Sequence, residues 1–586
     1  MKLRPPAAIA EWRIRMVAVG LGCLLLLRVW RLVSLQLLDT ERGYRFLQSQ
    51  GDARSLRVEP IPAHRGIISD RNGEPLAIST PVQTLWANPK QLVDKIEDWR
   101  PLASALGVAP DELERRIGSV ATREFVYLRR RMTPADAARV MALGIPGVYS
   151  RREYQRFYPA GQTAAHVVGF TNVDDRGQEG IELAYDEWLT GVPGSKQVIK
   201  DLYGHVIRDV QELSPARPGR ALDLSLDLRI QYLAHRELKK AIESASAESG
   251  CVVVLDARSG EILAMANQPT YNPNNRGGDI GSALRNRAIT DLVEPGSTMK
   301  PLTMIAALES GKYHPGMTME TSPGYIRVGR KTFRDHHNYG LLTLGGVITK
   351  SSQVGTVKIA MSLEPDAIRD VFVRAGLGQS VGTGFPGESV GVLPDYRKWS
   401  DVARANLAFG YGLSVTPLQL ARTYSILAAG GVEHPLTLLR GRGTPEAKPV
   451  YKPEIIAQLV DMMKTVTQPG GTALKAAIKG YTVAGKTGTV HRIGPGGYEA
   501  NRYVSLFAGF APATDPRIVA VVIVSDPRGG VYYGGAIAAP VFSTVVAGAL
   551  RLMDVPPDSP LLQTAARSEA EEIEAAAEAV GEPTPP

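Results

Sequence analysis

Two segments that lie far apart in the sequence both carry residues of nucleophilic catalysis. In the first, Ser297 stands three residues before Lys300, and in the second, residues 486–489 read Lys-Thr-Gly-Thr. A serine and a lysine at this spacing lie on one face of a helix, within hydrogen-bond reach, and form a nucleophile with its own base. Pro301 favours a helix start here, because a proline in the first turn removes an N–H that lacks a helical partner. The two segments together predict acyl-transfer chemistry.

Length and composition exclude several classes of protein. A chain of 586 residues, 44% of them apolar, has room for about two to four domains and is neither wholly disordered nor a polytopic membrane protein. The net charge is +8, although residues 569–586 carry six glutamates and no basic residue. A basic body suits anionic lipid or an acidic polymer. No nucleic-acid-binding motif occurs, so we expect no nucleic acid among the partners.

The N-terminal segment predicts one membrane anchor. Basic residues at positions 2, 4, 13 and 15 precede the apolar stretch 16–38, whose only charges are Arg28 and Arg31. An arginine near a helix end can extend its charge to the headgroups, so the stretch is long enough to cross a bilayer. A signal peptide is the alternative, but no cleavage site follows. The basic flank places residues 1–15 in the cytoplasm and the rest of the chain outside it.

Residues 39–220 predict an elongated, β-rich pedestal without catalytic residues. The segment contains many short strand-like runs, and an Asn-Gly pair at 72–73 indicates a tight hairpin. We expect it to serve as a docking or dimerisation platform. The residues predicted to have a structural role in it are Arg65, Gly66, Asp70, Asn72 and Gly73.

Residues 221–554 predict the catalytic domain. Strand-like runs stand on both sides of a long helical region, at 251–255, 262–266, 481–490, 504–510 and 518–524. Residues 231–246 and 540–553 have helical spacing. The two groups of strands can join into one antiparallel sheet, so the fold class is α+β, with helices packed on that sheet. The polar residues 555–586 predict a disordered acidic tail.

Three motifs in this order resemble those of the penicillin-binding protein and serine β-lactamase superfamily. They are Ser-x-x-Lys at 297–300, Ser-Ser-Gln at 351–353 and Lys-Thr-Gly-Thr at 486–489. The anchor and the segment 65–73 narrow the resemblance to class B penicillin-binding proteins. Phe-Gly-Tyr-Gly at 409–412 and Tyr-Tyr-Gly-Gly at 532–535 are most similar to the cell-division branch, the septal peptidoglycan D,D-transpeptidases. The resemblance implies a transpeptidase domain of the β-lactamase-like fold.

The resemblance also implies a role for each residue of the site. Ser297 would attack the bond between two D-alanines of a stem peptide, and Lys300 would accept its proton once burial and Lys486 have lowered the pKa of its amine. Ser351 would pass a proton to or from the amine, and Gly485 and Gly488, which carry no side chain, would leave room for substrate along an edge strand. The substrate-binding residues would be Gln353, Thr487, Gly488, Thr489, Tyr339, Tyr532 and Tyr533.

Residue 353 departs from the family pattern, which usually has asparagine at this position. Glutamine keeps the amide but adds a methylene, which displaces the amide by about an ångström if the backbone is fixed. Either the backbone compensates for a displacement of this size, or the enzyme has altered turnover or altered affinity for β-lactams. Ser351 is unchanged, so we still expect an active acylating enzyme.

Two adjacent histidines, His336 and His337, raise the question of a metal. Neighbouring residues on a strand point to opposite faces, and no carboxylate or cysteine stands at ligand spacing. We therefore expect neither a metal nor a cofactor.

Other functions could use the same serine site. A β-lactamase needs a deacylating base and no anchor, and a D,D-carboxypeptidase would lack the N-terminal module. A β-lactam sensor needs further membrane spans or a cytoplasmic effector, and a non-catalytic division scaffold would leave the motifs unexplained. An elongation-type or specialised paralogous transpeptidase stays open.

The resemblance implies a location and partners as well. We expect a single-pass protein of the cytoplasmic (inner) membrane with its catalytic domain in the periplasm. The expected partners are lipid-linked peptidoglycan stem peptides, β-lactam antibiotics, the membrane, a septal glycosyltransferase and other division proteins.

Overall fold

The chain passes repeatedly between two compact units. The computed structural model describes residues 11–36, 56–200, 206–277, 281–441, 446–494 and 496–559. Unit 1 comprises the residues up to His64 together with 81–154 and 191–218. Unit 2 comprises 65–80, 155–190 and everything from Gly219 onward. The Arg65–Gly73 segment, which the sequence places in the pedestal, thus packs with the catalytic part of the chain.

The N-terminal apolar stretch forms the helix α1 (Glu11–Gln36), which begins five residues before the predicted span. It is long and apolar enough to cross a membrane, and the apolar window lies fully exposed. A second helix, α19 (Gly534–Leu552), passes the same test of length and composition, but half of it is buried in the protein. We therefore interpret α19 as a core helix. Of residues 1–15, which the sequence predicts to be cytoplasmic, residues 1–10 lie outside the described residues.

Unit 1 joins antiparallel strands to short helices that each have a proline in the first two positions. Strands β1 (Leu56–Ile61), β8 (Gly194–Lys200) and β9 (Val206–Ser214) form one antiparallel sheet. The later residues of β3 (Pro75–Ala87) pair with β4 (Val126–Met132). Each helix has proline in its first two positions, where the missing N–H is harmless; they are α3 (Pro89–Lys95), α4 (Arg100–Leu106), α5 (Pro110–Gly118) and α6 (Pro134–Met141). Strand β5 is Val148–Phe157.

The predicted Asn-Gly hairpin is present in unit 2, between β2 (Ile68–Ser69) and β3. Asp70 closes its turn, because Oδ1 accepts hydrogen bonds from the backbone N–H groups of Asn72 at 2.7 Å and Glu74 at 2.9 Å. Gly73 has φ of +89°, a conformation that favours glycine. Asp70 Oδ2 accepts from the N–H of Leu228 at 3.0 Å. The hairpin is thereby fixed to the first turn of α10 (Leu228–Ser244).

A buried carboxylate shared by two arginines joins three segments of unit 2. The carboxylate of Glu182 is fully buried and forms ion pairs with Arg65 Nε at 2.5 Å and with Arg156 Nε at 2.6 Å. Arg65 Nη1 also lies 2.6 Å from Asp186. A Cβ atom on Gly66 would overlap the carbonyl oxygen of Arg220, which explains the glycine there. These contacts are packing and charge neutralisation away from the catalytic motifs.

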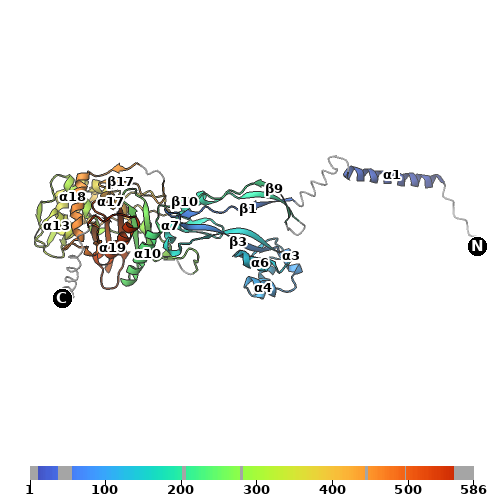
Figure 1. The fold of residues 1–586 in the computed structure, drawn as a ribbon, viewed down its shortest axis with the longest axis horizontal. Helices are drawn as coiled ribbons and strands as arrows, with labels where there is room; N and C mark the ends of the chain where they lie inside the picture. The colour runs from blue at the N-terminus through green and yellow to red at the C-terminus, as the bar shows by residue number, and fades with distance from the viewer. Residues whose placement is uncertain are drawn as a thin grey trace, which may run out of the picture. The chain divides into compact units, whose positions relative to one another are not determined.

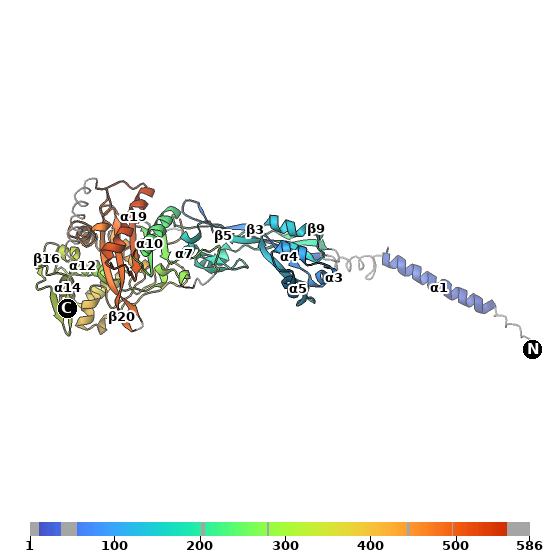
Figure 2. The same ribbon diagram turned by 90° about the horizontal axis from the view of Figure 1, so that it is seen from below.

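The predicted antiparallel sheet with packed helices is confirmed. Its strand order is β12-β11-β21-β20-β19, so the strands before and after the helical region meet in one sheet. The bounds are β11 (Ser249–Asp256), β12 (Ile262–Gln268), β19 (Ala484–Gly494), β20 (Gly497–Ala511) and β21 (Ile518–Ser525). Helices α10 and α19 lie side by side against these strands (Figures 1 and 2), and α17 (Pro417–Ala428) also packs on them. The α+β fold class follows.

Short elements complete unit 2. The remaining helices are α7 (Ala165–Val168), α8 (Gly180–Ala184), α9 (Asp186–Leu189), α11 (Arg287–Thr290), α12 (Lys300–Glu309), α13 (Leu344–Thr349), α14 (Gln353–Ser362), α15 (Pro365–Arg374), α16 (Asp401–Leu407) and α18 (Pro453–Lys464). The short strands are β6 (Phe170–Thr171), β7 (Gly177–Glu179), β10 (Leu222–Asp223), β13 (Thr318–Glu320), β14 (Tyr325–Val328), β15 (Lys331–Arg334), β16 (Leu341–Thr343), β17 (Val432–Glu433) and β18 (Lys448–Pro449).

The first residues of the predicted acidic tail lie against unit 2. The carbonyl of Val555 accepts a hydrogen bond from the Tyr481 hydroxyl at 2.6 Å, and Ser559 N donates to Gly480 O at 3.1 Å. The rest of the predicted tail, 560–586, lies outside the described residues.

Candidate active site

The three motifs line one cleft of about 740 Å³ in unit 2. Ser297 comes from a short 3₁₀ turn (Gly296–Met299), Ser351 and Gln353 from the junction of α13 and α14, and Thr487 with Thr489 from β19, the edge strand. The predicted residues that line it are Ser297, Ser351, Gln353, Thr487, Thr489, Tyr339, Tyr532 and Tyr533. Three other predicted residues, Lys300, Lys486 and Gly488, are not on its surface.

The turn that carries Ser297 leads directly into α12, as Pro301 predicts, but Ser297 itself precedes the α-helix. Lys300 is the first residue of α12. The turn is fixed by Thr298, whose Oγ1 donates to Pro295 O at 2.6 Å and whose carbonyl accepts from the Tyr424 hydroxyl at 2.9 Å. The nucleophile therefore stands on backbone that the core holds in place.

Lys300 is fully buried, and its amine bonds to Ser351. The helical spacing predicts a bond to Ser297 instead. Its Nζ donates to Ser351 O at 2.5 Å and to Ser351 Oγ at 3.0 Å. Burial lowers the pKa of the Lys300 amine to about 7, against the opposing effect of the Asp335 charge. An amine with this pKa is partly neutral at physiological pH and can accept a proton.

Lys486 is the second fully buried lysine of the site. Its Nζ donates to Thr487 O at 3.2 Å and to Thr487 Oγ1 at 3.3 Å. Burial, with a smaller contribution from the charge of Lys300, holds the pKa of Lys486 well below its ordinary value. Thr487 also shares a 2.9 Å hydrogen bond with Thr472. An anionic group that enters the cleft would relieve the cost of a positive charge here.

The glycines of the Lys-Thr-Gly-Thr strand have a different role from the predicted one. A Cβ on Gly488 would lie 3.1 Å from both Pro295 O and Thr298 Cγ2, beneath the Ser297 turn. A Cβ on Gly485 would lie 2.5 Å from the Phe507 ring. The missing side chains thus make room for neighbouring protein atoms, not for substrate. Gly488 lets the third motif approach the first.

Aromatic rings form a continuous wall along the cleft. Tyr503 stacks on Tyr532 with centroids 4.0 Å apart, and Tyr532 stacks on Tyr533 at 4.6 Å. His491 extends the row at 4.7 Å from Tyr503. Sequence reasoning identified Tyr532 and Tyr533 but missed His491 and Tyr503, and also Tyr411. His491 and Tyr503 are opposite each other in the β19–β20 pair, whereas Tyr411 comes from the loop between α16 and α17.

The two adjacent histidines do not lie on a strand, so the argument that they point to opposite faces is wrong. They belong to the loop after β15, and both line the cleft. His336 lies 6.2 Å from the Tyr533 ring and His337 lies 6.0 Å from the Tyr339 ring, measured between centroids. A loop can turn consecutive side chains to the same side, which a regular strand cannot do.

Asp335 is a site residue that sequence reasoning passed over. It caps α14, because Oδ1 accepts from the backbone N–H groups of Gln353 at 2.5 Å and Val354 at 3.1 Å. Oδ2 accepts from Ser352 Oγ at 2.6 Å. The carboxylate thus holds the second motif in place and supplies the negative charge that raises the pKa of Lys300. The sequence gives no signal for this, since Asp335 lies in the loop after β15, and only the fold brings it to the start of α14.

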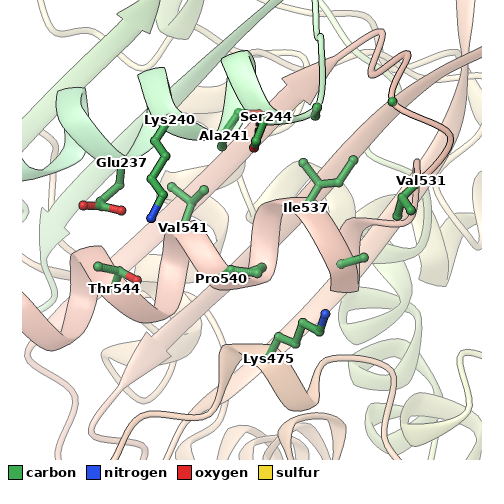
Figure 3. A pocket seen from close by; sticks show the side chains of 13 residues that line it. Glu237, Lys240, Ala241, Ser244, Lys475, Val531, Ile537, Pro540, Val541 and Thr544 are labelled. Atoms are coloured by element: carbon green, nitrogen blue, oxygen red, sulfur yellow. Dashed lines mark hydrogen bonds between the residues drawn. The ribbon is translucent and has the colours of Figure 1, made fainter. Parts of the chain in front are cut away.

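A separate cavity of about 400 Å³ lies between α10 and α19 (Figure 3). Lys240 and Ala241 of α10 face Ile537 and Val541 of α19 across it, and Lys475 approaches from below in this view. None of the motif residues lines it. Of these two cavities, only the cleft of about 740 Å³ is lined by motif residues.

Two family models match the chain. Residues 60–224 match the penicillin-binding protein dimerisation domain, and residues 250–547 match the penicillin-binding protein transpeptidase domain. The chain is 42% identical to the peptidoglycan D,D-transpeptidase FtsI of Escherichia coli, over 94% of this chain and 93% of that protein. It is 41% identical to the probable peptidoglycan D,D-transpeptidase PbpC of Pseudomonas aeruginosa, over 90% and 93% of the two chains.

Solved structures agree with these matches. Penicillin-binding protein 3 of Mycobacterium tuberculosis, crystallised with aztreonam, is 29% identical, with a TM-score of 0.66 over 86% of this chain and 99% of that one. The transpeptidase domain of penicillin-binding protein 3 from Burkholderia pseudomallei is 37% identical, with a TM-score of 0.53 over 57% and 98%. The chain therefore belongs to the class B penicillin-binding proteins, with a dimerisation domain followed by a transpeptidase domain.

Proposed function

We propose that this protein is a septal peptidoglycan D,D-transpeptidase that forms its acyl-enzyme on Ser297. The observation that carries the proposal is the junction of the first two motifs, in which a buried lysine with a pKa of about 7 bonds to Ser351 beside Ser297. The 42% identity to the E. coli D,D-transpeptidase FtsI over 94% of the chain supports the reaction and the septal role.

The first step is acylation. The Ser297 oxygen forms a bond to the carbonyl carbon between two D-alanines while its proton passes to the neutral amine of Lys300. The C–N bond to the terminal D-alanine then breaks, and the proton reaches the leaving amine through Ser351. The N–H groups of Ser297 and Thr489 would stabilise the oxyanion, a contribution of about 3 kcal/mol in comparable sites.

The second step transfers the acyl group to another stem peptide. The acceptor amine attacks the ester carbon, gives up its proton through Ser351 and Lys300, and releases Ser297 with its proton restored. The hydroxyls of Thr487 and Thr489, which line the cleft, suit the terminal carboxylate of the donor, and Lys486 acts behind them through its hydrogen bond to Thr487 Oγ1. A β-lactam acylates Ser297 in the same way, but its leaving group stays tethered after ring opening. No cofactor takes part in these steps.

We place the protein at the cytoplasmic membrane, anchored by α1. Four basic residues precede or begin the apolar stretch, which favours a cytoplasmic N-terminus. The catalytic domain would then face the periplasm, where the cross-linked polymer lies. Lipid-linked stem peptides, a septal glycosyltransferase and other division proteins are the partners that fit this location.

Acylation by a fluorescent penicillin tests the reaction. We expect full-length protein in detergent to gain one covalent label, detected by intact mass and by gel fluorescence. Ser297→Ala should abolish the label without changing the melting temperature appreciably. A wild-type protein that folds but takes no label would contradict the proposal and favour the non-catalytic scaffold.

Depletion of the protein tests the septal role. Filaments with the protein at midcell indicate division, whereas round cells indicate an elongation-type enzyme. Normal morphology with retained acylation would point to a specialised paralogue or a β-lactam sensor.

A further inference from the structure

The turn that carries Ser297 is held between two segments from distant parts of the chain. On one side, Gly296 N donates to Gly410 O at 3.1 Å, and a Cβ on Gly410 would overlap Gly296 O. On the other side, a Cβ on Gly296 would overlap Cγ1 of Val490 on β19. Two glycines are thus needed for this close approach. The position of Ser297 depends on how firmly the 410–412 loop and β19 hold the turn.

Glu294 lies two residues before this turn, and its carboxylate bonds to the 410–412 loop and to β20. Its Oε1 accepts from the backbone N–H of Gly412 at 2.7 Å. The Tyr498 hydroxyl, which is on β20, lies 3.0 Å from each oxygen of the same carboxylate. Glu294 is only 5% exposed. A buried carboxylate is costly unless it is hydrogen-bonded, so these partners are what make the position tolerable for a charge.

The local irregularity of β20 explains how Tyr498 reaches Glu294. Pairing with β19 changes from His491 opposite Tyr503 to Ile493 opposite Tyr498, so residues 499–502 bulge out of the ladder. The bulge is anchored by Arg502, which lies 2.6 Å from Asp526. The Tyr498 ring then lies 6.1 Å from that of Tyr411, within the 410–412 loop. Tyr498 therefore connects the β19–β20 pair with the 410–412 loop on the other side of the Ser297 turn.

We propose that Glu294 is a positioning residue for acyl transfer, whose carboxylate joins the 410–412 loop to Tyr498 and so keeps the Ser297 turn in register with β19. Glu294 does not line the cleft and acts only through these partners. The inference rests on the proposed acylation of Ser297. A misplacement of about 1 Å in a reacting group can cost about a hundredfold in rate, which is the scale on which such a clamp matters.

The test separates binding from chemistry in full-length protein in detergent. Stopped-flow acylation by a fluorescent penicillin gives the dissociation constant of the initial complex and the rate constant of acylation. We expect Glu294→Ala to lower the rate constant by about tenfold or more, with a smaller change in the dissociation constant. Glu294→Gln keeps an oxygen that can accept from Gly412 and Tyr498, so it should recover most of the rate. Tyr232→Phe, at an exposed tyrosine of α10, is the matched control for tyrosine variants.

Tyr498→Phe tests the contact between Glu294 and β20 alone, since it removes the hydroxyl and keeps the ring. We expect a loss of about threefold in the rate constant, and no further loss when it is added to Glu294→Ala, because both changes remove one interaction. Fully additive effects would overturn the proposal. So would a lower melting temperature with an unchanged rate constant, or a Gln variant as slow as the Ala variant.

Two further outcomes are distinguishable. If Glu294→Ala does not fold, Tyr498→Phe decides alone: a rate constant lowered about threefold supports the proposal, and an unchanged rate constant overturns it. If wild-type protein takes no label, the proposed function fails before this inference is reached.

Discussion

Lys300 Nζ lies 3.0 Å from Ser351 Oγ and also donates to the Ser351 carbonyl, so the base of the first motif is joined to the serine of the second. Ser351 has φ of +55°, a left-handed conformation that is uncommon for serine. This backbone places its oxygen atoms around the amine. The proton path that the mechanism needs is thus already connected on the lysine side before substrate binds.

The rate of acylation should rise with pH through about 7. Because burial lowers the pKa of Lys300 to about 7, the amine is mostly protonated below that pH and cannot accept the serine proton, and it is mostly neutral above it. Rate constants with a labelled penicillin, measured from about pH 5.5 to about pH 8.5, should show this rise. Lys300→Arg should be inactive throughout, since a guanidinium stays protonated. A flat wild-type profile would argue against Lys300 as the base.

Asp335→Asn should move that pH profile toward lower pH. The Asp335 charge raises the pKa of Lys300, so its removal lets the pKa fall further. The asparagine oxygen can still cap α14, so we expect a stability loss of no more than about 1 kcal/mol. The midpoint of the acylation profile measures the shift, and Asp461→Asn, at an exposed ion pair on α18, is the control. A shift toward higher pH would contradict the electrostatic argument.

Gly296→Ala should abolish measurable acylation and lower the melting temperature. The added Cβ would overlap Val490 Cγ1, and the residue has φ of +55°, where a side chain adds about 1 kcal/mol of strain. Adding Val490→Ala removes the overlapping atom and should recover part of both losses. Thermal unfolding and labelling of the two variants check this. A single variant with normal acylation would show that the turn can shift at little cost.

Gln353→Asn should change the rate of acylation, with an increase as the expected direction. Gln353 lines the cleft, and among the described residues its carboxamide makes no hydrogen bond to the protein. Shortening the side chain by one methylene returns the amide to the family position and should improve its alignment with the substrate. Single-turnover labelling gives the rate, with Gln353→Ala as a control that should be slower than both. Equal rates for all three residues would mean that this amide does not position the ligand.

The elements that follow from local pattern were predictable. Residues 251–255 and 518–524 are continuous apolar runs, and they form central strands because such runs are buried on both faces. The Asn-Gly pair at 72–73 predicts the hairpin because this dipeptide favours a tight turn. Element starts were less accurate: α19 begins at Gly534, before the predicted residue 540, since Pro540 is tolerated inside that helix.

The parts of the site that depend on tertiary contacts were not predictable. Asp335 reaches Ser352 from the loop after β15, and Tyr503 joins Tyr532 only through the fold. The role of Gly488 was misassigned because a sequence shows that a side chain is missing but not which atoms take the space. The Ser297–Lys300 spacing was right in placing both at one site, yet the partner of the amine is Ser351.

The two fully buried lysines set a limit on how this protein can evolve. Replacing Lys300 or Lys486 by an apolar residue of similar size would remove a desolvation penalty and leave a better-packed interior. Any such gain in heat resistance would end the chemistry. Selection for a more stable protein must therefore act elsewhere, for example on the central sheet or around Glu182. The region around Lys300 and Lys486 keeps the desolvation cost of its two amines.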